Sequence, residues 1–180
     1  MPIYHTAAGL VEALEWGDGP ELFVLLHAAA TESHSLSSLA TLLLRPDRRV
    51  IAPALDRYGA TTTREGSDRV QAHVDVLRAC TEIHPAERRV LFGHSMGGLI
   101  GLLGAIGGLV FDAMVLYEPI VTAWLRTDLP RDVALWDWDR MIAAEVVRGV
   151  STGDPAGGIA ASVTAWNEVP WSDLPSAVRA

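Results

Sequence analysis

The strongest constraint on the fold of this chain is a glycine-rich turn, Gly93-His94-Ser95-Met96-Gly97-Gly98, between two apolar runs. The run before it is Arg89-Val90-Leu91-Phe92, and the run after it extends from Leu99 to Val110. This order predicts a buried strand, a sharp turn and a helix. A G-x-S-x-G turn of this kind lifts the serine hydroxyl clear of the sheet, beside the free N–H groups that begin the helix.

Strand and helix patterns alternate along residues 1–119 and predict a parallel sheet covered by helices on both faces. We expect an opening hairpin within residues 3–16 and a long loop at 54–66. The expected strands are Leu22–His27, Arg49–Pro53, Val90–Gly93 and Ala113–Tyr117, and the expected helices are Leu36–Leu44, Ser67 or Asp68 to Ile83, and Met96–Leu109. The predicted fold class is therefore α/β.

The character of the chain changes after Pro119. Residues 120–180 hold five of the six tryptophans and no strong strand pattern. Helices are expected at about Ala134–Arg148 and Asp154–Trp166, with a short one from Ser172. We therefore expect two regions, an α/β core at 1–119 and a helical region at 120–180. The tryptophans pack these helices together, form an apolar roof over Ser95 that favours small uncharged acyl substrates, or do both.

Composition excludes several classes of function. The net charge is −8 and every one of the 14 basic residues is arginine, which argues against binding to nucleic acids or anionic membranes. The absence of lysine excludes Schiff-base and P-loop lysine chemistry. No Cys/His cluster has metal-binding spacing, so we expect no metal and no cofactor. The single cysteine, Cys80, and the lack of a leader pattern favour a cytoplasmic protein.

The chain resembles the α/β-hydrolase superfamily over about Leu10–Ala180. Five segments carry the likeness in the family's order: Leu25-Leu26-His27-Ala28, Arg49–Pro53, Asp56-Arg57-Tyr58-Gly59, Gly93–Gly98 and Leu116-Tyr117-Glu118-Pro119. The Gly93–Gly98 turn matches the family's nucleophile elbow, and the Trp-rich region resembles its helical cap. Family members usually continue with two more strands that bring an acid and a histidine. The chain therefore resembles the first two-thirds of a member, an incomplete α/β-hydrolase fold.

The resemblance implies a serine hydrolase that acts on an ester, thioester or related acyl substrate. Ser95 would be the nucleophile, and the N–H groups of Met96 and Ala28 would stabilise the oxyanion. Glu118 is a candidate acid, because some family members place the acid after this strand; its alternative is a carboxylate that anchors the lid. The alternative for Ser95 is a buried serine at a helix entry.

No histidine follows His94, so the base that should activate Ser95 is missing from these 180 residues. His27 is expected to act mainly through a structural hydrogen bond, and His94 through packing or a supporting hydrogen bond. His34 lies at the pocket mouth or in an exposed loop. The residues expected to line the substrate pocket are His27, Ala29, His34, His94, Trp124 and Trp138.

Three interpretations follow from the missing base. In the first, a C-terminal segment or a partner chain completes a serine hydrolase. In the second, the chain keeps the fold and the pocket for binding without catalysis. In the third, it is a fragment without activity, and the open edge of its last strand pairs with a second copy or with a C-terminal partner segment. A serine nucleophile argues against opening epoxides or carbon–halogen bonds, which needs a carboxylate.

Overall fold

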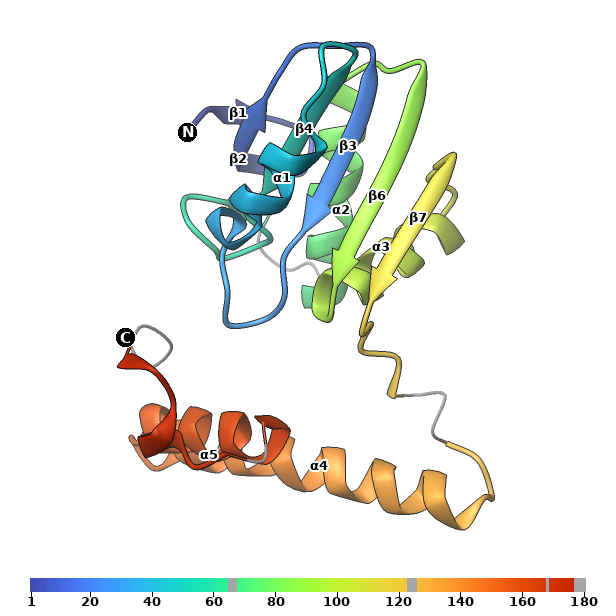
Figure 1. Cartoon of the computed structure of the whole chain (residues 1–180). Helices are drawn as coiled ribbons and strands as arrows, with labels where there is room; N and C mark the ends of the chain where they lie inside the picture. Colours follow the sequence, from blue (N-terminus) through green and yellow to red (C-terminus); the bar gives the residue numbers. More distant parts are fainter. Residues whose placement is uncertain (65–67, 123–125, 168, 177–180) are drawn as a thin grey trace. The chain divides into compact units, whose positions relative to one another are not determined.

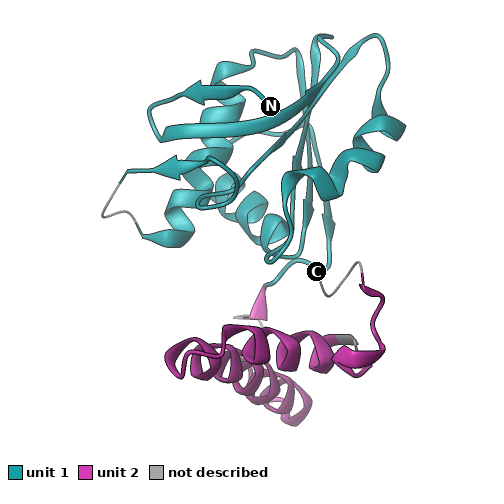
Figure 2. Cartoon of the chain, turned by 90° about the vertical axis from the view of Figure 1, so that its left-hand side faces the viewer, with its two compact units in different colours: residues 1–120 teal, residues 121–180 magenta. Residues whose placement is uncertain are grey.

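A computed structural model describes residues 1–64, 68–122, 126–167 and 169–176 of the chain. Its contacts divide the chain into two compact units, Met1–Ile120 and Val121–Ala180, which are coloured separately in Figure 2. The first unit contains the sheet, and the described part of the second is helical. Each unit is described below by itself.

The first unit is built on one sheet of seven described strands (Figure 1). The central strands β4, β3, β6 and β7 run parallel to one another, whereas β1, β2 and β5 pair antiparallel. The order is β1-β2-β4-β3-β6-β7, with β5 paired to β2. The strands are β1 Ile3–His5, β2 Gly9–Trp16, β3 Glu21–Leu26, β4 Arg48–Pro53, β5 Thr62–Thr63, β6 Arg88–His94 and β7 Ala113–Tyr117. The predicted mostly parallel sheet is confirmed.

Helices cover both faces of this sheet, as the sequence predicts. Helix α1 (Ser37–Leu43) packs on one face, while α2 (Arg69–Ile83) and α3 (Met96–Ile106) pack on the other. Successive residues of β3 point into opposite layers, because Val24 belongs to the core under α2 and α3, and Leu25 to the core under α1. A strand buried on both faces reads as an unbroken apolar run, which is the pattern of residues 22–26.

Three local details of the first unit differ from the sequence prediction. Helix α3 ends at Ile106 rather than at Leu109, because Gly107 and Gly108 follow, and Gly108 takes a φ of 91° that continues no helix. The helix expected at 36–44 is a 3₁₀ turn, Ser33–Leu36, followed by α1. The short strand β5 lies inside the predicted loop, where only two residue pairs join it to β2.

The second unit is a hairpin of two helices, α4 (Pro130–Ser151) and α5 (Pro155–Asn167), followed by a 3₁₀ turn at Trp171–Asp173. Helix α4 starts four residues before the expected 134, because proline fits the first helical turn, where its missing N–H loses no hydrogen bond. The helix backbones touch where they cross, since a Cβ on Gly149 would lie 2.8 Å from Gly158 Cα. The rings of Trp138 and Trp166 pack edge to face, 4.7 Å apart.

Two features are absent from the residues that the structure describes. No helix among them combines the length and the apolar character that crossing a bilayer requires. Within the same residues, no group of three or more histidine, cysteine, aspartate or glutamate side chains lies close enough to hold a metal ion.

Candidate active site

Ser95 occupies a sharp turn between β6 and α3. Strand β6 ends at His94, helix α3 begins at Met96, and Ser95 joins them with φ 52° and ψ −113°. A serine in this left-handed region carries about 1–3 kcal/mol of strain, which persists only where the surroundings hold it. Here Ser95 N–H donates to Tyr117 O at 2.9 Å, and Ser95 O accepts from Ile120 N–H at 3.2 Å. Two main-chain bonds, one to the last residue of β7 and one to the segment after it, therefore hold the turn.

Two glycines make this turn sterically feasible. A Cβ at Gly93 would lie 2.6 Å from Gly97 O, so the strand could not pass this close to the helix that follows it. A Cβ at Gly97 would lie 2.4 Å from Leu26 O, on the neighbouring strand β3. Both distances are far below van der Waals contact. Both glycines of the G-x-S-x-G pattern are therefore required, because other backbone atoms approach too closely to leave room for a Cβ on either side of Ser95.

The Ser95 side chain is half-buried, and its hydroxyl makes no hydrogen bond to any residue that the structure describes. It stands at the amino end of α3, where the first N–H groups have no acceptor within the helix. Those groups and the helix dipole favour negative charge at this point. The N–H of Met96, the sequence's candidate oxyanion donor, is the first of these groups.

The turn after β3 lies at the carboxyl end of the parallel strands, as Ser95 does. Leu26 pairs in register with Gly93, so Ala28 and Ser95 each follow two residues behind directly paired positions. Ala28 is buried, and its carbonyl accepts from Thr31 Oγ1 at 2.8 Å. Ala29 is exposed. The turn is thus ordered by its own hydrogen bonds, and the parallel register brings it beside the elbow.

His27 is fully buried and supports this turn from behind. Its Nδ1–H donates to Ala28 O at 2.8 Å, and its Nε2 accepts from Leu55 N–H at 3.1 Å, a tautomer assigned from these two partners. Burial lowers the pKa of His27, which keeps the ring neutral in the fold. With both nitrogens engaged and no exposed surface, His27 offers a substrate no contact in this structure.

Tyr58 completes the support, and the sequence prediction assigned it no role at the site. Its ring packs edge-on against His27 at 4.7 Å, and its hydroxyl accepts from Ala30 N–H at 3.1 Å. Ala30 has a φ of 57°, so the tyrosine holds a strained residue of the turn. The Asp56-Arg57-Tyr58-Gly59 motif marks the loop, but nothing in it indicates which distant backbone its tyrosine reaches.

Glu118 follows the strand that neighbours the one leading into Ser95. His94, the last residue of β6, pairs with Tyr117, the last residue of β7, so Ser95 and Glu118 are the first residues beyond two paired strand ends. Glu118 also has a positive φ, 47°. Its side chain is exposed and is bonded to no other residue in the described ranges. A free carboxylate on a strained residue therefore stands next to the strained serine.

The remaining predicted pocket residues lie in different environments. The half-buried His94 ring packs against Tyr117, with 5.1 Å between centroids. The His34 side chain is 71 % exposed, with its Nδ1 3.3 Å from Glu32 Oε2. Trp138 belongs to the second unit, where it contacts Trp166. Trp124 lies outside the described residues. The structure thus places four of the predicted site residues at the carboxyl end of the parallel strands: Ala28, Ser95, Met96 and Glu118.

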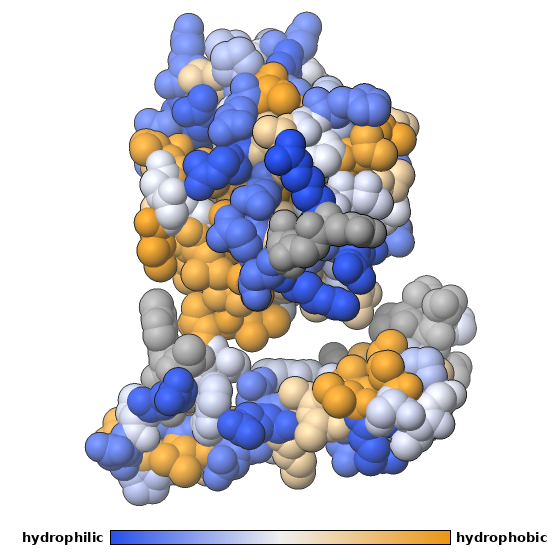
Figure 3. Space-filling view, turned by 180° about the vertical axis from the view of Figure 1, so that it is seen from behind, coloured by the Kyte–Doolittle hydropathy of each residue, from blue (hydrophilic) through white to orange (hydrophobic). Residues whose placement is uncertain are grey.

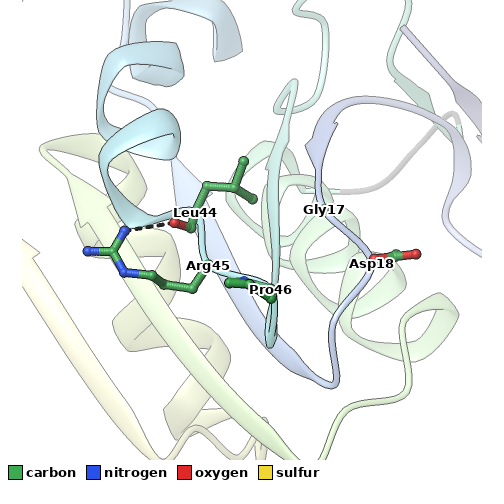
Figure 4. Close-up of a pocket in the computed structure, with 5 residues that line it drawn as sticks. All are labelled: Gly17, Asp18, Leu44, Arg45 and Pro46. Atoms are coloured by element: carbon green, nitrogen blue, oxygen red, sulfur yellow. Dashed lines mark hydrogen bonds between the residues drawn. The ribbon is translucent and has the colours of Figure 1, made fainter.

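Two surface hollows among the described residues lie at the amino end of the parallel strands, opposite the end where Ser95 lies. One, of about 340 Å³, is lined by Gly17, Asp18, Leu44, Arg45 and Pro46 (Figure 4). These residues precede β3 and β4, whereas Ser95 follows the end of β6, and all three strands are parallel. The Arg45 guanidinium donates to Leu44 O at 2.7 Å instead of facing the hollow. This hollow is therefore remote from the elbow.

A parallel sheet with a serine on a strained strand-to-helix turn defines the class of α/β hydrolases. The sequence model of the alpha/beta hydrolase family matches residues 23–179, and the chain belongs to this family. A search of curated proteins finds no match.

Solved structures show the same fold. The chain is similar to an alpha/beta hydrolase from Sphaerobacter thermophilus, with 20% identity and a TM-score of 0.68 over 98% of this chain and 63% of that one. An esterase from Exiguobacterium antarcticum matches with 16% identity and a TM-score of 0.62, over 79% of this chain and 55% of that one. An epoxide hydrolase from an endophytic Streptomyces matches with 24% identity and a TM-score of 0.55, over 64% of this chain and 35% of that one. The chain thus spans less than two-thirds of each of these proteins.

Proposed function

We propose that the chain carries the nucleophile and the oxyanion site of a serine hydrolase for esters, thioesters or related acyl compounds. The observation that carries the proposal is Ser95 at φ 52° between two sterically required glycines, at the amino end of α3. Backbone strain of this kind is retained where function needs it. The similarity to the solved esterase structure supports the fold alone.

In the proposed reaction, Ser95 Oγ attacks the acyl carbon while its proton passes to a base. The N–H groups of Met96 and Ala28 stabilise the negative charge on the carbonyl oxygen. The leaving group departs as an alcohol or thiol, taking the proton from the base. Water then attacks the acyl-enzyme, releasing the carboxylic acid and restoring Ser95.

The base comes from outside these 180 residues in this proposal. Both ring nitrogens of His27 are bonded to backbone, and His94 packs against Tyr117. We assign the incoming histidine to a C-terminal segment or to a partner chain. Glu118, exposed beside Ser95, is the proposed acid that orients it.

The second unit is proposed as a cap, so that 1–119 form the core and 120–180 the lid region. Its tryptophans, with Trp124 and Trp138 foremost, would then offer an apolar surface to a small uncharged acyl group. Ala29, in the loop after β3, and His34, in the 3₁₀ turn that follows it, are both exposed and are the proposed residues of the pocket mouth. The buried lone cysteine, Cys80, supports a cytoplasmic location in this proposal.

The test is labelling with a fluorophosphonate, which reacts with activated serines. The protein is purified from its own cells, with any segment or partner that it carries there. We expect one adduct per chain, on the peptide containing Ser95. Ser95→Ala must abolish labelling, and Ser38→Ala, at an exposed serine of α1, must leave it unchanged. Absence of the adduct in the native protein contradicts the proposal.

A binding protein without catalysis is the second candidate, and the absence of a histidine after His94 favours it. Without a base, turnover would rest only on the oxyanion site and on substrate binding. This candidate predicts that a non-hydrolysable acyl analogue binds equally well to the native protein and to Ser95→Ala, while the fluorophosphonate labels neither.

A further inference from the structure

The turn after β3 contains an alanine in a conformation that glycine normally adopts. Ala28 O accepts from Thr31 N–H at 3.4 Å and from Thr31 Oγ1 at 2.8 Å, which closes a four-residue turn. Ala30, the third residue of this turn, has a φ of 57°. Turns with a positive φ at the third position prefer glycine there, because a Cβ makes that conformation strained. The turn therefore needs support from outside its own residues.

That support comes from the loop after β4. Tyr58 Oη accepts from Ala30 N–H at 3.1 Å, so this hydrogen bond holds the strained residue itself. The tyrosine ring also packs edge-on against His27, whose Nδ1–H donates to Ala28 O. From the same loop, Leu55 N–H donates to His27 Nε2 at 3.1 Å. Two residues of one loop therefore reach the turn, one directly and one through the His27 ring.

Strand β2 braces the loop that carries Tyr58. Glu12 Oε2 accepts from Ala60 N–H at 2.6 Å, and Glu12 N–H donates to Thr61 Oγ1 at 3.0 Å. Within the loop, Tyr58 N–H donates to Leu55 O at 2.9 Å, and Thr61 N–H donates to Tyr58 O at 3.0 Å. The main chain on both sides of Tyr58 is therefore fixed, so its hydroxyl can hold the turn instead of following it.

Helix α2 supports the loop from a second element. Asp56 N–H donates to His73 Nδ1 at 3.0 Å, and the Tyr58 ring packs against the core under α2 and α3. The side of the first unit that α2 covers is largely hydrophilic in the rear view (Figure 3), as expected for a helix whose buried residues, Val74 and Leu77 among them, face the core. The tyrosine ring is thus anchored in the interior while its hydroxyl reaches the turn.

We propose that Tyr58 is a positioning residue for the oxyanion site. Its hydroxyl keeps Ala30 at positive φ, and the turn that this φ closes keeps Ala28 N–H directed at the carbonyl oxygen of the acyl substrate. Tyr58 acts through the turn and does not touch the substrate. The inference rests on the proposed function, because that function makes Ala28 N–H an oxyanion donor. The residues that carry it all lie in the first unit.

The test measures the rate of fluorophosphonate labelling at Ser95 in the protein purified from its own cells. Tyr58→Phe keeps the ring and removes only the hydroxyl. One neutral hydrogen bond changes a rate by up to about tenfold, and we expect labelling to slow on that order. With p-nitrophenyl acetate as substrate, kcat should fall and KM should stay within about twofold, because the oxyanion forms only on the way to the transition state. Circular dichroism checks that each variant is folded.

Ala30→Gly supplies a rescue that a merely structural role of the tyrosine would not give. Glycine adopts positive φ without the penalty of a Cβ, so the turn no longer needs the hydroxyl. Tyr58→Phe added to Ala30→Gly should therefore slow labelling by about threefold at most, relative to Ala30→Gly alone.

Tyr4→Phe is the matched control, because it also removes one tyrosine hydroxyl. That hydroxyl is bonded to Glu15, and the Tyr4 ring contacts His84, which lies beside Arg49 near the start of β4 rather than its end. The labelling rate of Tyr4→Phe should stay within about twofold of the parent rate, since distant sites act independently.

Three results would overturn the proposal. The first is a parental labelling rate in Tyr58→Phe, and the second is an equal loss with and without Ala30→Gly. The third is an equal loss in Tyr4→Phe. Each of these requires a parent protein that is labelled at Ser95. A parent protein without any adduct contradicts the hydrolase proposal itself, and this one with it, so the two failures are distinguishable.

Discussion

The approach of α3 to β3 makes Gly97→Ala the most informative substitution in the chain. The new methyl group would lie 2.4 Å from Leu26 O and 2.6 Å from Leu26 C, both backbone atoms of a buried strand. Restoring a contact of about 3.0–3.4 Å requires the helix and the strand to separate by about 0.6–1.0 Å. Overpacking costs about 1–3 kcal/mol, and we take the upper end because backbone cannot rotate away. Helix propensity offsets about 1 kcal/mol, leaving a net loss of about 2 kcal/mol.

Gly104→Ala in the same helix is the matched control. Its methyl group would meet Leu77 Cδ2 at 2.9 Å and Leu109 Cδ1 at 3.1 Å, both ends of side chains that can rotate. The propensity gain then balances the crowding, and we expect a change within about 0.5 kcal/mol. Urea unfolding followed by circular dichroism, compared at constant m value, measures both changes.

The same separation should reach the chemistry. Leu26 lies two residues before Ala28, and Gly97 two residues after Ser95, so moving them apart widens the gap between the two proposed oxyanion donors. A displacement of about 1 Å in an active site lowers rates on the order of a hundredfold. We expect fluorophosphonate labelling to slow accordingly in Gly97→Ala and to be normal in Gly104→Ala. If Gly97→Ala is as stable as the parent, or Gly104→Ala loses as much, the close-approach argument is wrong.

Three further predictions concern stability. His27→Phe should cost about 1–3 kcal/mol, because the buried Leu55 N–H loses its acceptor, while Ala28 O keeps the bond from Thr31 Oγ1. Burial lowers the pKa of His27, so the unfolded chain protonates first. The acid loss of stability below about pH 6.5 should therefore become shallower in the variant, as urea midpoints on either side of that pH will show. Tyr4→Phe should cost about 1 kcal/mol. Burial and the hydrogen bond to Glu15 raise the pKa of Tyr4 to about 12. The parent protein, unlike the variant, should therefore lose stability as the pH rises above about 10, which alkaline unfolding curves test. Gly149→Ala should open the α4–α5 hairpin at Gly158, changing tryptophan fluorescence, and an unchanged spectrum would contradict the backbone contact.

The elbow and the layers of the sheet were predictable because each depends on a local pattern. Residues 22–26 read as a strand buried on both faces, and the glycines around Ser95 specify the turn. The Asp68 alternative for the start of α2 is also observed, with its carboxylate accepting from Val70 N–H and Gln71 N–H. These features need only the residues that form them.

Long-range contacts were not predictable from a single sequence. Only four residues, 17–20, separate β2 from β3 in the sequence, yet β2 pairs with β4, which lies between the two. Tyr58 reaches Ala30 across 28 positions of sequence. The positive φ of Glu118 has no local signal either, because its neighbours Tyr117 and Pro119 are compatible with an ordinary extended residue. Strand order and cross-chain hydrogen bonds depend on how distant segments assemble.

The two main-chain hydrogen bonds from Ser95 to Tyr117 and Ile120 couple the reactive turn to β7. Each opening of the end of β7 would release the strained serine toward a relaxed conformation. Any element that holds β7 in place therefore also fixes the position of the Ser95 hydroxyl. Hydrogen exchange at the Ser95 and Ile120 amides would report how tightly the strand grips the turn.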